Sequence, residues 1–287
     1  SLAGKVATGG RLDIDALMSG GATAGAGVDI GGGGGGGGAG AGVTITGTSR
    51  SDHISTTTSV AGQPRATGHA DTLSGMGGAD TLRGGAGDDS LLGGGGADKL
   101  YGDEGADTMA GGDRNDTYYA DSADRIIEAA DAGNDRVYSD ESFTLPANVE
   151  RLYLTGEDRV NGVGNGLDNV LNGNAADNRL RGLDGDDTLS GGGGDDILEG
   201  GDGADSLRGG PGEDRFVFVR GEARGDRVED FSRGDLLEFR GYAPNSTFKP
   251  VAGSDDEWRV TDGQTGLSEI ITFTKAYALG AGDFLFT

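Results

Sequence analysis

Apolar residues recur at every ninth position along two long stretches of this chain, residues 66–119 and 164–217. Each block of nine carries an aspartate or asparagine at its sixth position and an apolar residue at its eighth, as in GGAGDDSLL at residues 84–92. The last three residues of a block therefore place one side chain inward and two outward, which predicts a three-residue β-strand. The six residues before them are rich in glycine, which can adopt positive φ and turn the chain sharply.

The register of the blocks does not slip within either stretch, and one further block in register stands alone at residues 47–55. Two blocks form one coil of 18 residues with a strand on each side, so successive coils stack at the spacing of neighbouring strands, about 4.8 Å. This pattern predicts an all-β fold, a parallel β-roll or β-helix solenoid. The inward residues at the eighth positions are Leu73, Leu82, Leu91, Leu100, Met109, Tyr118, Leu171, Leu180, Leu189, Leu198, Leu207 and Phe216.

Stacking of the coils brings the sixth-position side chains into columns along the edges of the solenoid. Like charges at this spacing repel each other unless a divalent cation lies between them. Calcium accepts six to eight oxygen ligands, including the backbone carbonyls that glycine turns expose, so we expect calcium sites in the turns. The predicted sixth-position ligands are Asp71, Asp80, Asp89, Asp98, Asp107, Asp116, Asn169, Asn178, Asp187, Asp196, Asp205 and Asp214. The glycines expected to complete these sites are Gly75, Gly77, Gly84, Gly87, Gly93, Gly95, Gly102, Gly111, Gly182, Gly185, Gly191, Gly193, Gly200, Gly203 and Gly209.

The composition favours calcium binding and excludes several other classes of protein. Glycine makes up 61 of the 287 residues, and aspartate makes up 36 of the 48 acidic residues, whereas a merely solubilising acidic surface favours glutamate. The 23 Lys and Arg residues leave a net charge of -25, so we expect no nucleic-acid partner. No run of 18 apolar residues predicts a membrane span, and the absence of cysteine excludes disulfides and thiol chemistry.

The nonapeptide GGxGxDxLx of these blocks resembles the calcium-binding repeat of repeats-in-toxin (RTX) proteins, which bacteria export by type I secretion. The resemblance covers residues 66–119 and 164–217 closely and the remainder by general pattern only. It implies a secreted, extracellular bacterial protein with the type I secretion apparatus as a partner during export. It also implies several bound calcium ions, roughly eight.

Segments outside the repeats complete the predicted organisation. Residues 120–163 carry strand-like stretches without nonapeptides, and we expect wider coils that continue the stack; two rolls joined by a linker are the alternative. Residues 218–287 hold most of the phenylalanines and predict a β-rich cap, because a solenoid end exposes an apolar core and unpaired backbone. The ending Asp283-Phe284-Leu285-Phe286-Thr287 resembles the C-terminal export signal of type I substrates, and the same residues also fit a last strand of the cap. The predicted domains are residues 1–18, 19–46, 47–119, 120–163, 164–217 and 218–287.

Residues 1–18 contain the stretch GKVATGGRL, which resembles the last segment of the catalytic domain of subtilisin-like serine proteases. The alternative is the end of an unrelated preceding domain. Residues 19–46 predict a flexible Gly/Ala-rich linker. We interpret the chain as the tail of a longer exported protein. Its only histidines, His53 and His69, lie in repeat turns, so these residues contain no Ser-His-Asp triad and the chain itself is not expected to be an enzyme.

Two functions fit these observations. The first is a module that stays unfolded inside the cell, where calcium is scarce, and folds on calcium outside it, because the binding sites exist only in the folded chain. The second is a module that binds a cell-surface glycan, or an adhesin segment; the net charge disfavours a polyanionic glycan and leaves a neutral one. Within the first function, Asn169 and Asn178 lack a charged ligand, so their blocks are predicted to bind calcium most weakly.

Overall fold

The computed structural model describes residues 41–274 and 279–287, and every regular element in these ranges is a β-strand. The chain divides into two compact units. Among the described residues, the first unit comprises residues 41–114 and 123–132, and the second comprises the rest. The subtilisin-like resemblance and most of the predicted linker fall in residues 1–40, outside the described residues.

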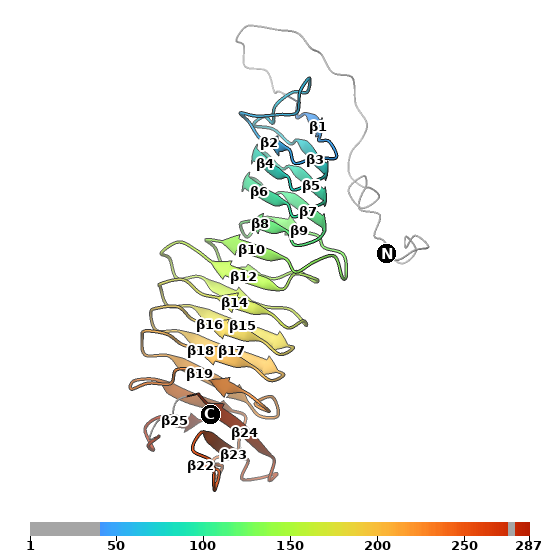
Figure 1. Cartoon of the computed structure of the whole chain (residues 1–287). Coiled ribbons are helices and arrows are strands. Elements are labelled where there is room, and N and C mark those ends of the chain that lie inside the picture. The colour runs from blue at the N-terminus through green and yellow to red at the C-terminus, as the bar shows by residue number, and fades with distance from the viewer. Residues whose placement is uncertain (1–40, 275–278) are drawn as a thin grey trace. The chain divides into compact units, whose positions relative to one another are not determined.

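The first unit is a parallel β-roll whose strands alternate between two sheets as the chain proceeds (Figure 1). Thr72 pairs with Ser90 in one sheet, and Thr81 pairs with Lys99 in the other. The partners in these two pairs are 18 residues apart, which confirms the predicted coil of two blocks within the repeats. One sheet contains β1 (Thr44–Thr46), β3 (Thr72–Gly77), β5 (Ser90–Gly95), β7 (Thr108–Asp113) and β9 (Arg125–Ile126), and the other contains β2 (His53–Ile54), β4 (Thr81–Ala86) and β6 (Lys99–Glu104).

The second unit is built in the same way and contains the longer stack of coils. One of its parallel arrays runs β8 (Thr117–Tyr119), β10 (Arg136–Ser139), β12 (Arg151–Leu154), β14 (Val170–Asn172), β16 (Thr188–Ser190), β18 (Ser206–Arg208) and β20 (Arg227–Val228). The other runs β11 (Phe143–Thr144), β13 (Asn161–Val163), β15 (Arg179–Asp184), β17 (Ile197–Asp202), β19 (Arg215–Val219), β21 (Leu236–Arg240) and β25 (Phe284–Phe286).

Several strands are longer than the three residues that the pattern predicts. Strands β3 to β7 and β15 and β17 have six residues each, because pairing continues into the first three residues of the next block. Beyond the strand, Gly78 N–H still donates to the Gly95 carbonyl of the neighbouring coil at 2.8 Å. Parallel coils of equal length keep their backbones in register through the turn. The prediction of three-residue strands considered one coil at a time and so missed this pairing between coils.

The cores of both units consist of ladders of inward side chains, one from each strand. All twelve predicted eighth-position residues are 0% exposed. Because each coil adds only two such side chains, burial of apolar surface per residue is small for a folded domain. Stability therefore depends strongly on what happens in the turns, where most of the remaining residues lie.

Residues 133–163 form coils of the second unit, but these coils are irregular in length and the prediction that they are wider than the repeat coils is wrong for the first of them, which spans 15 residues from Arg136 to Arg151. Arg136 pairs with Arg151 and Phe143 pairs with Gly162, so the spacing between partners differs from that of the repeats. The linker predicted at residues 19–46 also extends too far toward the C-terminus, because its last three residues form a strand. Thr44–Thr46 forms β1 and pairs with Thr72–Ser74, because Ile45 occupies an inward position and is fully buried.

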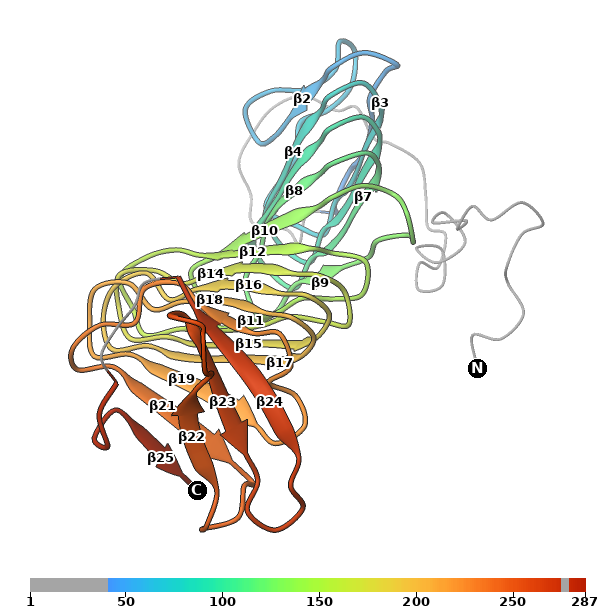
Figure 2. The same ribbon diagram turned by 60° about the horizontal axis from the view of Figure 1, so that its bottom comes forward.

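The C-terminal region covers the last coil of the second unit with aromatic residues. The strands β22 (Thr247–Pro250), β23 (Glu257–Thr261) and β24 (Ser268–Phe273) lie side by side as an antiparallel sheet, and β24 continues the array through β20 (Figure 2). Phe239 is fully buried, and its ring lies 5.6 Å from Phe218 and 4.9 Å from Phe248. Trp258 is only half-buried, so the aromatic core of this region is centred on Phe239 and not on the tryptophan.

Candidate metal centre

The sixth-position carboxylates form hydrogen-bonded columns in both units. One oxygen, Oδ1, accepts the backbone N–H of the sixth-position residue of the preceding coil, as from Asp71 to Asp89 (2.6 Å) and from Asp187 to Asp205 (2.9 Å). The first unit contains the columns Asp52, Asp80, Asp98 and Asp71, Asp89, Asp107, Asp124. The second contains Asp116, Asp135, Glu150, then Asn169, Asp187, Asp205, Asp226, then Asn178, Asp196, Asp214, Asp235.

The other oxygen, Oδ2, points into the turn. At eight described positions of the columns it is buried and accepts no hydrogen bond, although burial of an unneutralised carboxylate is costly. Burial accordingly raises the pKa of Asp187 and of Asp196 to about 7. The residues of the repeat blocks with such an unpartnered Oδ2 include Asp80, Asp89, Asp107, Asp187, Asp196, Asp205 and Asp214, each at most 3% exposed.

In the blocks whose Oδ2 has no partner, the first glycine forms a cradle around this oxygen. A Cβ atom on Gly84 would lie 2.3 Å from Oδ2 of Asp89 and 2.9 Å from the carbonyl oxygen of Gly102 in the next coil. Side-chain atoms do not approach this closely, so any residue other than glycine would fill the space that the two oxygens border. A Cβ would approach Oδ2 of the sixth residue similarly closely at Gly75, Gly84, Gly93, Gly102, Gly182, Gly191, Gly200 and Gly209. The carbonyl oxygen of the next coil's first glycine also borders the space at Gly75, Gly84, Gly93, Gly182 and Gly191.

The remaining predicted glycines do not line the carboxylate in this way. At the fourth position of their blocks, φ is 111° for Gly87, 113° for Gly185 and 148° for Gly203, and a Cβ would collide with the backbone of the preceding coil. A Cβ on any of the third-position glycines Gly77, Gly95 and Gly193 would meet its nearest atom at 3.7 to 3.9 Å, so glycine is not required there for space. Gly111 lies within β7.

Three predicted ligands differ from the others. Asp71, Asn169 and Asn178 lie in the columns, but both polar atoms of each side chain have hydrogen-bond partners. Their turns therefore present no unpartnered oxygen to a cation.

The structure also adds carboxylates that the nonapeptide pattern misses. Asp226 and Asp235 end two columns of the second unit, where they accept the N–H groups of Asp205 (3.1 Å) and Asp214 (3.0 Å). Burial raises the pKa of Asp226 to about 8. Each lies 21 residues after its neighbour in the column, so a sequence pattern with a period of nine residues does not find it. The signal that would reveal them is an acid two residues before an inward apolar residue, as in Asp226-Arg227-Val228.

These turns fit a hard divalent cation. Their donor atoms are carboxylate and backbone carbonyl oxygens, with no nitrogen or sulfur ligand, and the carboxylates are held in place by backbone hydrogen bonds from the neighbouring coil. Calcium prefers such oxygen-rich, irregular cages. In these turns Oδ2 of the sixth-position aspartate would hold the ion. In the blocks that begin at Gly75, Gly84, Gly93, Gly182 and Gly191, the carbonyl of the next coil's first glycine would hold it as well.

A family model described as the RTX calcium-binding nonapeptide repeat (4 copies) matches residues 65–100, 87–118, 101–124, 163–198 and 190–221. The chain carries RTX calcium-binding repeats. The matched ranges contain all twelve predicted sixth-position ligands. The RTX repeats thus explain why carboxylates without partners are tolerated in the turns: calcium is the ion that such repeats bind.

The crystal structure of the extracellular lipase LipA from Serratia marcescens is similar to this RTX chain, with 18% sequence identity and a TM-score of 0.32. The match covers 78% of the RTX chain and 39% of the lipase chain. No curated protein matches the chain. Among the described residues, no helix is long and apolar enough to cross a membrane.

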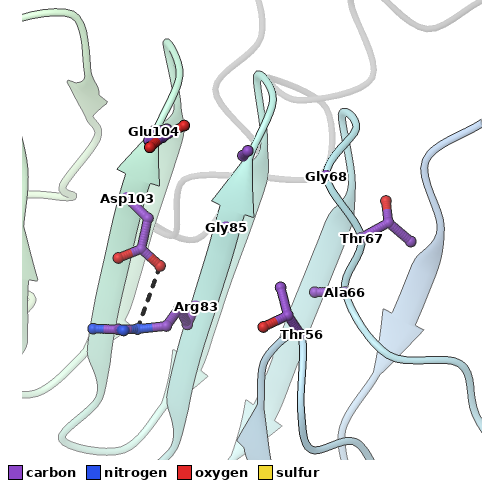
Figure 3. A pocket seen from close by; sticks show the side chains of 9 residues that line it. Thr56, Ala66, Thr67, Gly68, Arg83, Gly85, Asp103 and Glu104 are labelled. Carbon is purple, nitrogen blue, oxygen red and sulfur yellow. Dashed lines mark ion pairs between the residues drawn. The ribbon is translucent and has the colours of Figure 1, made fainter.

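A groove of about 650 Å³ lies in the first unit, lined by Thr56, residues 66–68 and residues of β4 and β6 (Figure 3). Arg83 in its wall pairs with Asp103, with 3.3 Å between Nε and Oδ2. The Arg83 guanidinium also lies over the ring of Tyr101, 4.5 Å from its centroid. Because Asp103 neutralises Arg83, the groove has no free positive charge in its wall for an anionic ligand.

Proposed function

We propose that this chain is a calcium-dependent folding module of a protein exported by type I secretion. The observation that carries the proposal is the set of buried, unpartnered carboxylate oxygens in the RTX turns. In the absence of a cation these oxygens oppose folding, and with calcium they become ligands. Calcium outside the cell would then fold a chain that crosses the secretion channel unfolded, and the lack of cysteine suits such passage.

The energetic argument is a linkage between binding and folding. The net charge of -25 and a core of two inward side chains per coil leave the metal-free chain with little to offset its backbone entropy. Sites that exist only in the folded state convert binding free energy into folding free energy. In this proposal the parent protein is a secreted hydrolase, such as a subtilisin-like protease, and its catalytic residues precede this chain.

The C-terminal residues have two roles in this proposal. Phe284–Phe286 forms β25 and pairs with Leu237, Glu238 and Phe239, so it closes the cap of the second unit. The same residues would serve as the export signal, read before the cap folds. The two roles are compatible because they belong to different states of the chain. The tail would be unfolded at low calcium, where the secretion apparatus reads it, and would form a strand at the higher calcium outside the cell.

Far-UV circular dichroism of the full chain tests calcium-dependent folding. We expect a coil spectrum in EGTA and a β spectrum in millimolar calcium, with a reversible transition. Magnesium at the same concentration should substitute poorly, because it demands tight octahedral geometry and keeps its waters. A β spectrum that EGTA leaves unchanged would refute the proposal.

A second candidate function is the binding of a neutral glycan, and the groove beside Arg83 and Tyr101 favours it. The Arg83 guanidinium lies over the Tyr101 ring and pairs with Asp103 through Nε, which holds its other N–H groups in the wall of the groove as donors to sugar hydroxyls. Retention of the calcium-loaded chain on neutral glycan beads, lost in the variant Tyr101→Ala, would support this function. Equal elution of the two proteins with no retention would exclude it.

A further inference from the structure

The turns of the RTX blocks are of two kinds, which the sixth-position residue alone does not distinguish. In four blocks the N–H of the second residue donates to the side-chain oxygen of the sixth; we name these closed turns. The pairs and distances are Thr48–Asp52 at 2.6 Å, Thr67–Asp71 at 2.5 Å, Asn165–Asn169 at 2.7 Å and Asn174–Asn178 at 2.8 Å. The oxygen that is unpartnered elsewhere is therefore satisfied within the turn itself.

The asparagine turns go further, because their amide groups also donate to backbone carbonyls of the preceding coil. Nδ2 of Asn165 donates to the Pro146 and Val149 carbonyls, both at 2.7 Å, and Nδ2 of Asn178 donates to the Val160 carbonyl at 2.7 Å. Asn169 and Asn174 make corresponding bonds of 2.9 to 3.3 Å. An amide N–H thus supplies the positive partner that a cation would supply to backbone oxygens.

The other blocks have open turns, in which the second residue has positive φ. It is Met76 (75°), Asp103 (67°) or Leu183 (93°) where it is not glycine, a conformation that costs such residues about 1 kcal/mol or more. None of the second residues of the closed turns has positive φ. Of the blocks with open turns, those of Asp80, Asp89, Asp107, Asp187, Asp196, Asp205 and Asp214 leave Oδ2 buried without a partner.

The closed turns occupy equivalent places in the two units. In the first unit they are in the two blocks that precede residue 75, and in the second they are in the two blocks that precede residue 182. Open turns follow in both units. Each run of open turns therefore begins after a pair of turns whose second and sixth residues are already hydrogen-bonded to each other.

We infer that the closed turns bind no calcium through their sixth-position residues and form a metal-independent start for each run of calcium-binding turns. The second residue decides the kind of turn: Thr or Asn at ordinary φ closes it, and a residue at positive φ opens it. This inference rests on the proposed calcium-dependent folding, and it predicts which turns keep their hydrogen bonds when calcium falls.

Hydrogen exchange of the full chain, followed by mass spectrometry at stepwise lower calcium, tests the inference. Amides of residues 164–181 should stay protected at calcium concentrations where those of residues 182–217 have begun to exchange, with rates at least about tenfold apart. Simultaneous loss of protection in both segments would overturn the inference but leave calcium-dependent folding intact. Undiminished protection of both segments in EGTA would instead refute the proposed function.

Substitution of the asparagines gives a second test. In the variant Asn169→Asp, Asn178→Asp, carboxylate oxygens face backbone carbonyls where the amides donated, so residues 164–181 should exchange about tenfold faster at limiting calcium. Asn172→Asp is the matched control, because Asn172 is half-exposed on β14 and should leave the rates within about twofold. Equal rates in the control and the double variant would contradict a role for the amides.

Discussion

Replacement of Gly200 by alanine tests the cradle in the turn of Asp205 directly. The φ of Gly200 is not positive, so alanine is compatible with the backbone there. Its Cβ, however, would lie 2.0 Å from Oδ2 of Asp205 and 2.4 Å from the Cγ atom of the same side chain. The carboxylate must therefore move by roughly 1 Å or more to restore an ordinary contact. Such a shift removes Oδ2 from the place where calcium would meet it.

The magnitude follows from the cost of overpacking a fixed site. Added methyl groups in well-packed surroundings cost about 1 to 3 kcal/mol, and Asp205 cannot swing away freely because its Oδ1 accepts the N–H of Asp187. For a domain of the size of the second unit, each kcal/mol lowers the melting temperature by about 2 to 4 °C. We therefore expect Gly200→Ala to melt about 2 to 12 °C lower in saturating calcium and to bind about one ion fewer.

The assay combines calorimetric calcium titration with thermal melting followed by circular dichroism. Gly166→Ala is the matched control, because a Cβ there meets nothing within 4 Å and its φ is not positive. If Gly200→Ala binds as much calcium as the control and melts within about 1 °C of it, the cradle is not part of a calcium site.

Three further outcomes are expected. Burial raises the pKa of Asp187 and Asp196 to about 7 in the metal-free fold, above the ordinary value near 4. Protonation of these two carboxyl groups therefore stabilises the metal-free fold fully below about pH 4, and this contribution is lost as the pH rises through about 7. Circular dichroism in EGTA should accordingly show more β structure at pH 5 than at pH 8. Phe239→Ala should cost about 3 to 5 kcal/mol and raise the calcium midpoint of folding, whereas Leu267→Ala, at a residue 42% exposed, should not. Leu189→Ala should cost about 2 to 5 kcal/mol in a calcium-saturated melt, and a loss below 1 kcal/mol would contradict the inward ladder.

The nine-residue pattern by itself determined the coils, the inward ladders and the existence of the carboxylate columns. A residue such as Leu189 is inward because a strand alternates its side chains and because equal blocks keep every coil in register. The same regularity places Asp187 next to Asp205 of the following coil. These properties repeat locally, so one block of sequence is enough to predict them for its neighbours.

The existence of two kinds of turn and the ends of the columns became visible only in the tertiary structure. Asp71 and Asp89 occupy the same position of their blocks, yet Oδ2 of Asp71 accepts the Thr67 N–H and Oδ2 of Asp89 accepts none. The two turns differ in the φ angle of the second residue, which is 108° at Gly85 and is not positive at Thr67. Asp226 likewise joins its column across 21 residues, because a longer loop still returns the chain to the same edge. Hydrogen bonds between coils depend on where the loops bring the chain, and a repeat pattern in the sequence does not contain that information.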